Sequence, residues 1–194
     1  MPDVVEALKR DFHNKCYICE LDHLQDQEIE HRIPHHGDKE LEFRWDNLFW
    51  ACGHCNSVKN QKKYDSGIVD CCTRDPEQLI YHRCAEGKVG VEAISDNSDS
   101  EVQNTVLLLN EVFNKDNTGM RVARTQERYR LLLQEMNVLY KTLESYEREE
   151  DKEPAQAMLK ALLDRRSAFS AFKRNYVREH REWYPELIDL LDAL

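Results

Sequence analysis

The stretch CYICELDHLQDQEIEHRIPHHGDKELEFRWDNLFWACGHC, residues 16–55, has a CxxC motif at each end, with 32 residues between the two motifs. Each CxxC can direct two thiolates at one metal ion, and two such motifs complete a tetrahedral zinc site with no open position. The sequence therefore predicts a structural zinc ion held by Cys16, Cys19, Cys52 and Cys55. In so short a segment, the metal is expected to contribute to folding. Four free buried cysteines are the alternative.

The positions of the other cysteines and histidines agree with a metal-rich N-terminal part. All seven cysteines lie between Cys16 and Cys84, and six of the eight histidines fall in the first 54 residues. The N-terminus lacks the basic start and apolar stretch of a signal peptide, so a reducing cytoplasm is expected, where CxxC pairs more often bind metal than form disulfides. No apolar run approaches the roughly 20 residues of a membrane span. Cys71, Cys72 and Cys84 are expected to be ordinary thiols.

Three elements are predicted between and after the first CxxC and the second. "EIEHRIP" (28–34) alternates like a strand, "WDNLFWAC" (45–52) reads as a second strand with Asp46 and Asn47 at its start, and "GHCNSVKNQKK" (53–63) reads as a short basic helix. The expected order is strand, loop, strand and helix, joined at both ends by zinc.

This order, with Glu-His-x-x-Pro at 30–34, Asp-Asn-Leu at 46–48 and Cys-x-x-Cys-Asn-x-x-x-Lys at 52–59, resembles the HNH endonucleases of the ββα-metal class. The resemblance covers residues 16 to about 63. It implies a phosphodiester hydrolase that acts on DNA with Mg²⁺ or Mn²⁺. A non-catalytic zinc-knuckle module that binds nucleic acid or protein remains the alternative, since it would keep the cysteines without the other residues.

By this resemblance, His31 is the general base, and an unperturbed histidine suits proton transfer near neutral pH. Glu30 and Asn56 supply the oxygen ligands that a hard divalent cation prefers. Asn47 holds the His31 ring or the loop around it. Lys59 and His35 are candidates for contact with the substrate phosphate.

The pattern departs from the family where Glu30 stands in place of the commoner Asp or His. Adjacent strand residues face opposite sides, so Glu30 and His31 are expected to reach one phosphate only if the backbone is distorted, as in a bulge. Taken singly, Glu30 reads as a solvated strand residue, Asn47 as a turn residue and Asn56 as a helix cap. His13, His23 and His54 are expected on the surface, and a solvated loop position for His35 and His36 is at least as reasonable.

Net charge argues against a large nucleic-acid surface. The chain has 27 Lys and Arg against 37 Asp and Glu, a net charge of −10. Residues 1–64 alone carry 9 basic and 12 acidic side chains, hence −3. Few phosphate-neutralising groups imply weak binding to DNA. We therefore expect a partner to deliver or hold the substrate.

The rest of the chain predicts an α+β fold in three parts: a nuclease module at 1–65, a connecting segment with a short hairpin at 66–100, and a helical region at 101–194. Helical periodicity places helices at 101–114, from 121 onward, from Pro154 to His180, and at 185–194, with a turn at 115–120. A basic run in the third helix reads as a solvated face more readily than as a nucleic-acid stripe. That run comprises Arg165, Arg166, Lys173, Arg174, Arg178 and Arg181.

The whole layout resembles the HNH nuclease subunit, PtuB, of bacterial Septu anti-phage systems and related retron systems, through looser matches at "LIYHRCAEGKVGVEA" and "SAFSAFKRNYV". This resemblance implies an ATPase partner of the ABC/SMC-like type (PtuA-like), a hetero-oligomeric complex and a free nuclease of restrained activity. A stand-alone restriction or repair nuclease is a third possibility, although no sequence-reading domain is evident.

Overall fold

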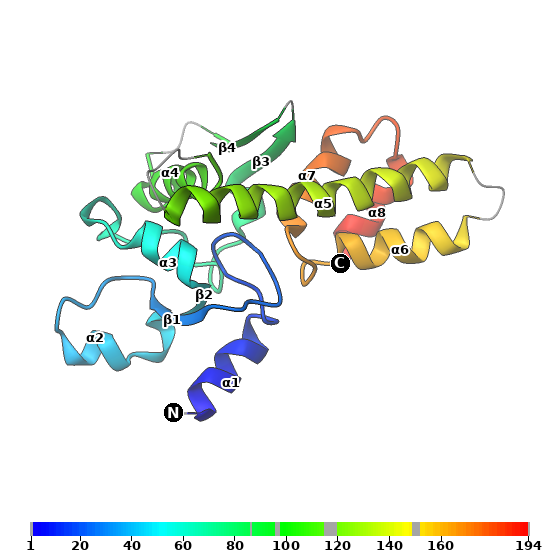
Figure 1. Ribbon diagram of the computed structural model, residues 1–194. Coiled ribbons are helices and arrows are strands. Elements are labelled where there is room, and N and C mark those ends of the chain that lie inside the picture. The colour runs from blue at the N-terminus through cyan, green and yellow to red at the C-terminus, as the bar shows by residue number, and fades with distance from the viewer. Residues whose placement is uncertain (1, 86, 96–97, 115–119, 149–151, 194) are drawn as a thin grey trace.

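Two small antiparallel sheets and a larger set of helices make up the computed structural model, and they confirm the predicted α+β class (Figure 1). The structure describes residues 2–85, 87–95, 98–114, 120–148 and 152–193. The strands are β1 (Gln27–His31), β2 (Leu48–Cys52), β3 (Ile80–Ala85) and β4 (Lys88–Ala93). The α-helices are α1 (Pro2–Asp11), α2 (Lys39–Phe43), α3 (Gly53–Lys59), α4 (Ser100–Asn114), α5 (Met120–Arg148), α6 (Glu153–Leu163), α7 (Ser170–Glu179) and α8 (Pro185–Ala193).

The first sheet and α3 follow one another in the order that the sequence predicts. Strand β1 pairs with β2 from Gln27 opposite Cys52 to His31 opposite Leu48, with no extra residue in either strand. Strand β2 begins at Leu48, later than predicted, because residues 45–47 form a 3₁₀ turn. The predicted loop between the strands contains α2, where the side chain of Asp38 accepts backbone hydrogen bonds at the first turn.

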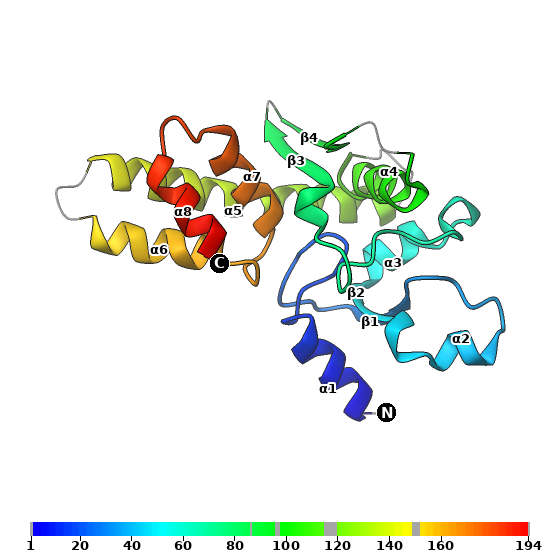
Figure 2. The same cartoon turned by 180° about the vertical axis from the view of Figure 1, so that it is seen from behind.

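The second sheet is the hairpin predicted in the connecting segment. Its register runs from Ile80 opposite Ala93 to Ala85 opposite Lys88. Helix α4 packs against β4 and helix α7 packs against β3, so the hairpin lies between them, as Figure 2 shows from behind. The predicted turn at 115–120 lies outside the described residues except for its last position.

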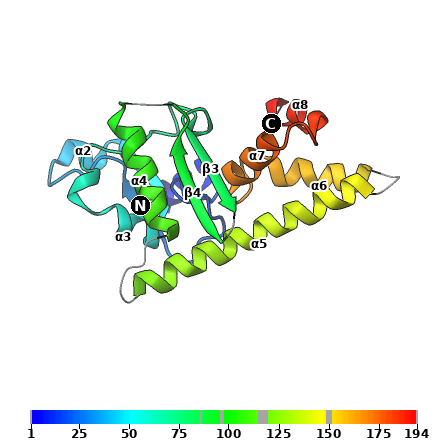
Figure 3. The same cartoon turned by 90° about the horizontal axis from the view of Figure 1, so that it is seen from above.

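The long helix α5 connects the two ends of the molecule. It contacts α3 and α4 near its beginning and α6 and α7 further along, and Figure 3 shows it running beneath the hairpin from one group to the other. Its buried residues Leu132, Met136, Leu139 and Leu143 repeat at helical spacing, as the sequence predicts. Among the described residues, no helix combines the length and apolarity needed to cross a membrane.

The prediction of one helix from Pro154 to His180 is wrong. Helix α6 ends at Leu163, and α7 begins only at Ser170, after Phe169 in a left-handed conformation with φ 50°. The break has a physical reason, because the freed carbonyls accept hydrogen bonds from buried cations. Arg174 donates to the Leu163 carbonyl at 2.8 Å, and Lys15 donates to the Arg165 carbonyl at 2.6 Å.

Candidate functional site

Four buried cysteines form a cluster that could hold a metal such as zinc. Cys16 and Cys19 come from the turn before β1, Cys52 ends β2, and Cys55 lies in the first turn of α3. Their sulfur atoms all lie within 4.8 Å of one another, and Cys19 Sγ is 3.9 Å from Cys52 Sγ. Tetrahedral Zn–S bonds of about 2.3 Å place sulfurs roughly 3.8 Å apart, so the donor set and spacing fit zinc.

The protonation of the four thiols also favours a cation between them. Burial raises the pKa of Cys19 and of Cys55 well above the ordinary value of a thiol. The pKa of Cys52 is lowered instead, because its sulfur accepts hydrogen bonds from Cys16 first and then from Cys19 and Cys55. Protein groups alone thus favour one thiolate among buried thiols, and a bound metal would displace the remaining protons.

Helices α4 and α5 cover this cysteine cluster. Burial lowers the pKa of Arg128 in α5, but the nearby thiolates of Cys19 and Cys52 outweigh it and raise that pKa, and the guanidinium hydrogen bonds Cys52. Arg128 and Arg124 both lie within 4 Å of the carboxylate of Asp26, at 3.9 and 3.7 Å. The cluster is therefore built into the contact between the first 65 residues and the helical region.

The prediction that His54 is exposed is wrong. Its side chain is only 1% exposed, and its Nε2 atom donates to the Val112 carbonyl of α4 at 3.2 Å. Thr125 Oγ1 of α5 lies 3.5 Å from the same nitrogen. His54 is buried because α4 and α5 pack over the second CxxC, a contact that sequence spacing does not predict. His13 and His23 are exposed, as predicted.

His31 lies at the end of β1 beside a hollow of about 500 Å³. The hollow is lined by residues 29–31, by the loop after β1 and by the end of α3, including Asn56 and Lys59. His31 Nε2 is 3.0 Å from the carbonyl oxygen of Glu42, and the His35 ring lies 4.7 Å from the His31 ring between centroids. His35 Nδ1 lies 3.8 Å from the Glu42 carboxylate. The structure thus brings His31, His35, Asn56 and Lys59 to one hollow.

Asn47 holds the loop after β1 and makes no hydrogen bond to the His31 ring. It is fully buried, and its Oδ1 atom accepts the Ile33 backbone N–H at 2.8 Å. Its Nδ2 atom donates to the carbonyls of Ile33 at 2.9 Å and Leu41 at 3.2 Å. Of the two roles expected for Asn47, the geometry corresponds to fixing the loop around His31.

Glu30 is buried and has partners on both carboxylate oxygens. Lys59 Nζ donates to Oε1 at 2.7 Å, and the Tyr17 hydroxyl donates to Oε2. Burial raises the pKa of Glu30 even though Lys59 opposes this shift. β1 contains no bulge, so Glu30 points to the α3 side. As it lies, Glu30 is not a solvated strand residue, and its oxygens are not open to a cation.

Asn56 and Lys59, on successive turns of α3, both bond to glutamates of β1. Asn56 Nδ2 donates to Glu28 Oε2 at 2.6 Å. Lys59 is 2% exposed, and its ammonium also donates to the His31 carbonyl at 3.0 Å. The helix cap is Cys52 and not Asn56, because the Cys52 side chain accepts the Cys55 N–H. The α3 side chains therefore hold β1 in place as the structure stands.

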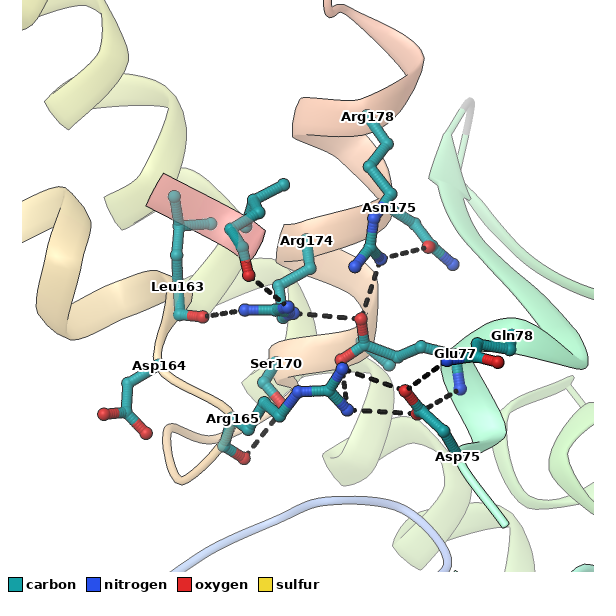
Figure 4. Close-up of polar contacts among 12 residues, drawn as sticks. Asp75, Glu77, Gln78, Leu163, Asp164, Arg165, Ser170, Arg174, Asn175 and Arg178 are labelled. Atoms are coloured by element: carbon teal, nitrogen blue, oxygen red, sulfur yellow. Dashed lines mark hydrogen bonds and ion pairs between the residues drawn. The ribbon is translucent and has the colours of Figure 1, made fainter. Parts of the chain in front are cut away.

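The basic run in residues 165–181 does not form a nucleic-acid stripe, because its main members bind carboxylates within the chain. Arg174 and Arg178 contact Glu77 Oε2 at 2.9 and 2.7 Å, and Arg165 binds Asp75 through two hydrogen bonds (Figure 4). Lys173 is fully buried and reaches Glu135 at 3.0 Å. A solvated face is also incorrect for these four residues.

Sequence reasoning missed Tyr17 and Arg128. Tyr17 lies inside the first CxxC, where its aromatic ring and hydroxyl gave a usable signal for a buried hydrogen bond. Arg128 belongs to a helix 73 positions after Cys55, and nothing in its local sequence marks it. No protein-family model matches the chain, and neither a curated protein nor a solved structure matches it.

Proposed function

We propose that the chain is an endonuclease of the HNH ββα-metal class that hydrolyses phosphodiester bonds of DNA. The observation that carries this proposal is the hollow beside His31. Strand β1 ends there, α3 forms its opposite wall, and the cysteine cluster joins the two elements. Asn47 additionally holds the loop through three hydrogen bonds. A histidine in a fixed loop beside a helix wall is the geometry that such a hydrolase needs.

In the proposed reaction, His31 acts as the base through Nδ1. The Glu42 carbonyl can only accept a hydrogen bond, so its contact with Nε2 places the ring proton there and leaves the lone pair on Nδ1. Nδ1 then takes a proton from water while the water oxygen bonds to phosphorus. The bond from phosphorus to the leaving sugar oxygen breaks, and that oxygen takes a proton from solvent.

A divalent cation would supply charge stabilisation at the phosphate when bound. Glu30 and Asn56 do not fit such an ion as they lie, because the Glu30 oxygens receive Lys59 and Tyr17 and the Asn56 amide donates to Glu28. This arrangement favours a second candidate function, a non-catalytic zinc-knuckle binding module. The endonuclease proposal therefore requires a rearrangement at Glu30.

The defence-complex part of the proposal rests on charge. Lys59 is buried and Lys63 pairs with Glu111, so little of the positive charge expected after the second CxxC faces solvent. The basic groups of α7 are also engaged internally. We propose that an ABC/SMC-like ATPase, PtuA-like in kind, supplies the missing grip on DNA in a cytoplasmic complex.

Cleavage of supercoiled plasmid tests the proposal. The purified chain is assayed with Mg²⁺ or Mn²⁺, alone and with the ATPase, beside His31→Ala. His23→Ala is the matched control, because His23 is exposed and distant in sequence from the hollow. Metal-dependent nicking that persists in His23→Ala and is lost in His31→Ala supports the endonuclease. Absence of cleavage with the ATPase present overturns it in favour of the binding module.

A further inference from the structure

Lys59 places a positive charge beside the carboxylate that is expected to bind a divalent cation. Its ammonium contacts two oxygen atoms, Glu30 Oε1 at 2.7 Å and the His31 carbonyl at 3.0 Å. The side chains are 2% and 5% exposed for Lys59 and Glu30. Carboxylate and carbonyl oxygens are also the ligands that Mg²⁺ and Mn²⁺ prefer.

We propose that the Lys59 ammonium occupies the place of the divalent cation, and that cation binding requires Lys59 to leave Glu30 for a substrate phosphate. The inference rests on the proposed function and goes further by making Lys59 the residue that couples the two binding events. In the structure as it stands, Lys59 satisfies the carboxylate and excludes a second cation from it.

Electrostatics explains why both cations cannot share the site. A buried carboxylate without a positive partner is costly, so Lys59 is a stabilising neighbour while the site lacks an ion. A dication at Glu30 would repel an ammonium held at hydrogen-bonding distance in the same low-dielectric surroundings. One cation must therefore leave before the other binds.

The surroundings of Lys59 provide a destination for its ammonium. Lys59 is the last residue of α3 and lines the hollow that also contains His31 and His35. Its four-carbon stem is flexible, and an ammonium is a good point-charge partner for phosphate. A phosphate in the hollow would then draw Lys59 away and release Glu30 Oε1. Phosphate and cation would each favour binding of the other.

Tyr17 keeps Glu30 in position during this exchange. Its hydroxyl donates to Oε2, and burial raises the pKa of Tyr17 well above its ordinary value, so the donor proton stays in place. Tyr17 lies between Cys16 and Cys19, so the cysteine cluster anchors one oxygen of Glu30. Departure of Lys59 thus frees a single, fixed carboxylate oxygen.

Binding of Mn²⁺ to the zinc-loaded chain tests the inference without an activity readout. Free Mn²⁺ is followed by electron paramagnetic resonance in the wild type and in Lys59→Met. We expect Lys59→Met to bind Mn²⁺ about tenfold more tightly, because Glu30 has lost its internal cation. Adding Glu30→Gln to Lys59→Met should remove this gain. Lys62→Met is the matched control, since it removes an exposed positive charge from the same hollow, and it should change the affinity less than about twofold.

A gain that is equal in Lys62→Met, or that survives Glu30→Gln, overturns the inference. So does a folded Lys59→Met with wild-type affinity. Lys59→Gln, which keeps a hydrogen-bond donor toward Glu30, replaces Lys59→Met if the latter does not fold. Plasmid cleavage separates the two proposals. Tighter Glu30-dependent binding without cleavage by any variant would leave the role of Lys59 standing and overturn the endonuclease. Tight Glu30-dependent binding by the wild type together with cleavage would do the reverse.

Discussion

His54 Nε2 donates a hydrogen bond to the Val112 carbonyl, and this contact joins the second CxxC motif to helix α4. The same ring lies beside Thr125 of α5. A residue between two cysteine ligands is therefore part of the contact between the first 65 residues and the helical region. Loss of order in either part is expected to be felt by the other.

We predict that His54→Ala lowers the free energy of unfolding by about 1–3 kcal/mol, because a buried carbonyl loses its donor and a cavity forms. Zinc content should remain that of the wild type, since the four cysteines complete the cluster without a histidine. Chemical denaturation and metal analysis check both parts. His23→Ala, an exposed histidine, should change neither. Loss of zinc in His54→Ala would make the histidine a ligand and contradict the four-cysteine cluster.

Cys52→Ser should lower both zinc stoichiometry and thermal stability, because it removes one of four ligands whose binding energy contributes to folding. Cys72→Ser is the control, as Cys72 is exposed and outside the cluster. Metal analysis and thermal melting provide the readouts. A Cys52→Ser protein with a full zinc complement and the wild-type melting temperature would rule out the proposed structural zinc.

The cysteine cluster could be predicted from sequence because its information is local. Two CxxC motifs specify four ligands by spacing alone, and the alternating patterns around residues 27–31 and 48–52 indicate the strands that bring them together. The hairpin at 80–93 and the apolar stripe of α5 are local patterns of the same kind. Each of these features depends on residues close in sequence.

The burial of His54 and the partners of Glu30 could not be predicted in the same way. His54 contacts Val112 and Thr125, which are 58 and 71 residues away. The break between α6 and α7 depends on Lys15 and Arg174 finding the carbonyls of residues 163 and 165. Helical periodicity continues through the break, so the local pattern favours one helix, and only the tertiary contacts favour two.

Acid should destabilise the contact between the first CxxC and α7 through Glu20. Burial acts to raise the pKa of this carboxyl, but Lys15 and the Ala171 backbone N–H outweigh it and lower the pKa below the ordinary 4.5. A lowered pKa in the folded state means that this stabilisation is present above the unfolded pKa and is lost as pH falls through the folded one. We expect Glu20→Gln to be less stable than the wild type at neutral pH and to lose less stability below about pH 4.5. Denaturation at several pH values checks this, and equal acid sensitivity would contradict it.

Glu77 is predicted to stabilise the packing of the hairpin against α7, because it receives Arg174 and Arg178 at 2.9 and 2.7 Å. Arg174 is 1% exposed, so Glu77→Gln leaves a buried guanidinium without its main charged partner. We expect a loss of about 3–5 kcal/mol, the range found when one member of a buried ion pair is removed. Glu127→Gln affects an exposed pair with Arg130 and should cost less than about 1 kcal/mol. Equal losses in urea denaturation would show that the Glu77 cluster contributes no more than a surface pair.

Asn47 should act as a positioning residue for His31. Asn47→Ala removes three buried hydrogen bonds to the Ile33 and Leu41 backbone, and we expect a loss of roughly 2–4 kcal/mol in stability. If the endonuclease proposal is correct, cleavage should fall further than the folded fraction does, because the loop that carries the Glu42 carbonyl no longer holds the His31 ring. Asn60→Ala, an exposed residue on the rim of the same hollow, is the control and should change neither quantity. The measurement is the cleavage rate per folded molecule at a temperature where both variants remain folded. A wild-type rate in Asn47→Ala would limit Asn47 to a structural role, whereas a reduced rate with an unchanged affinity for DNA would place its effect on the orientation of the base.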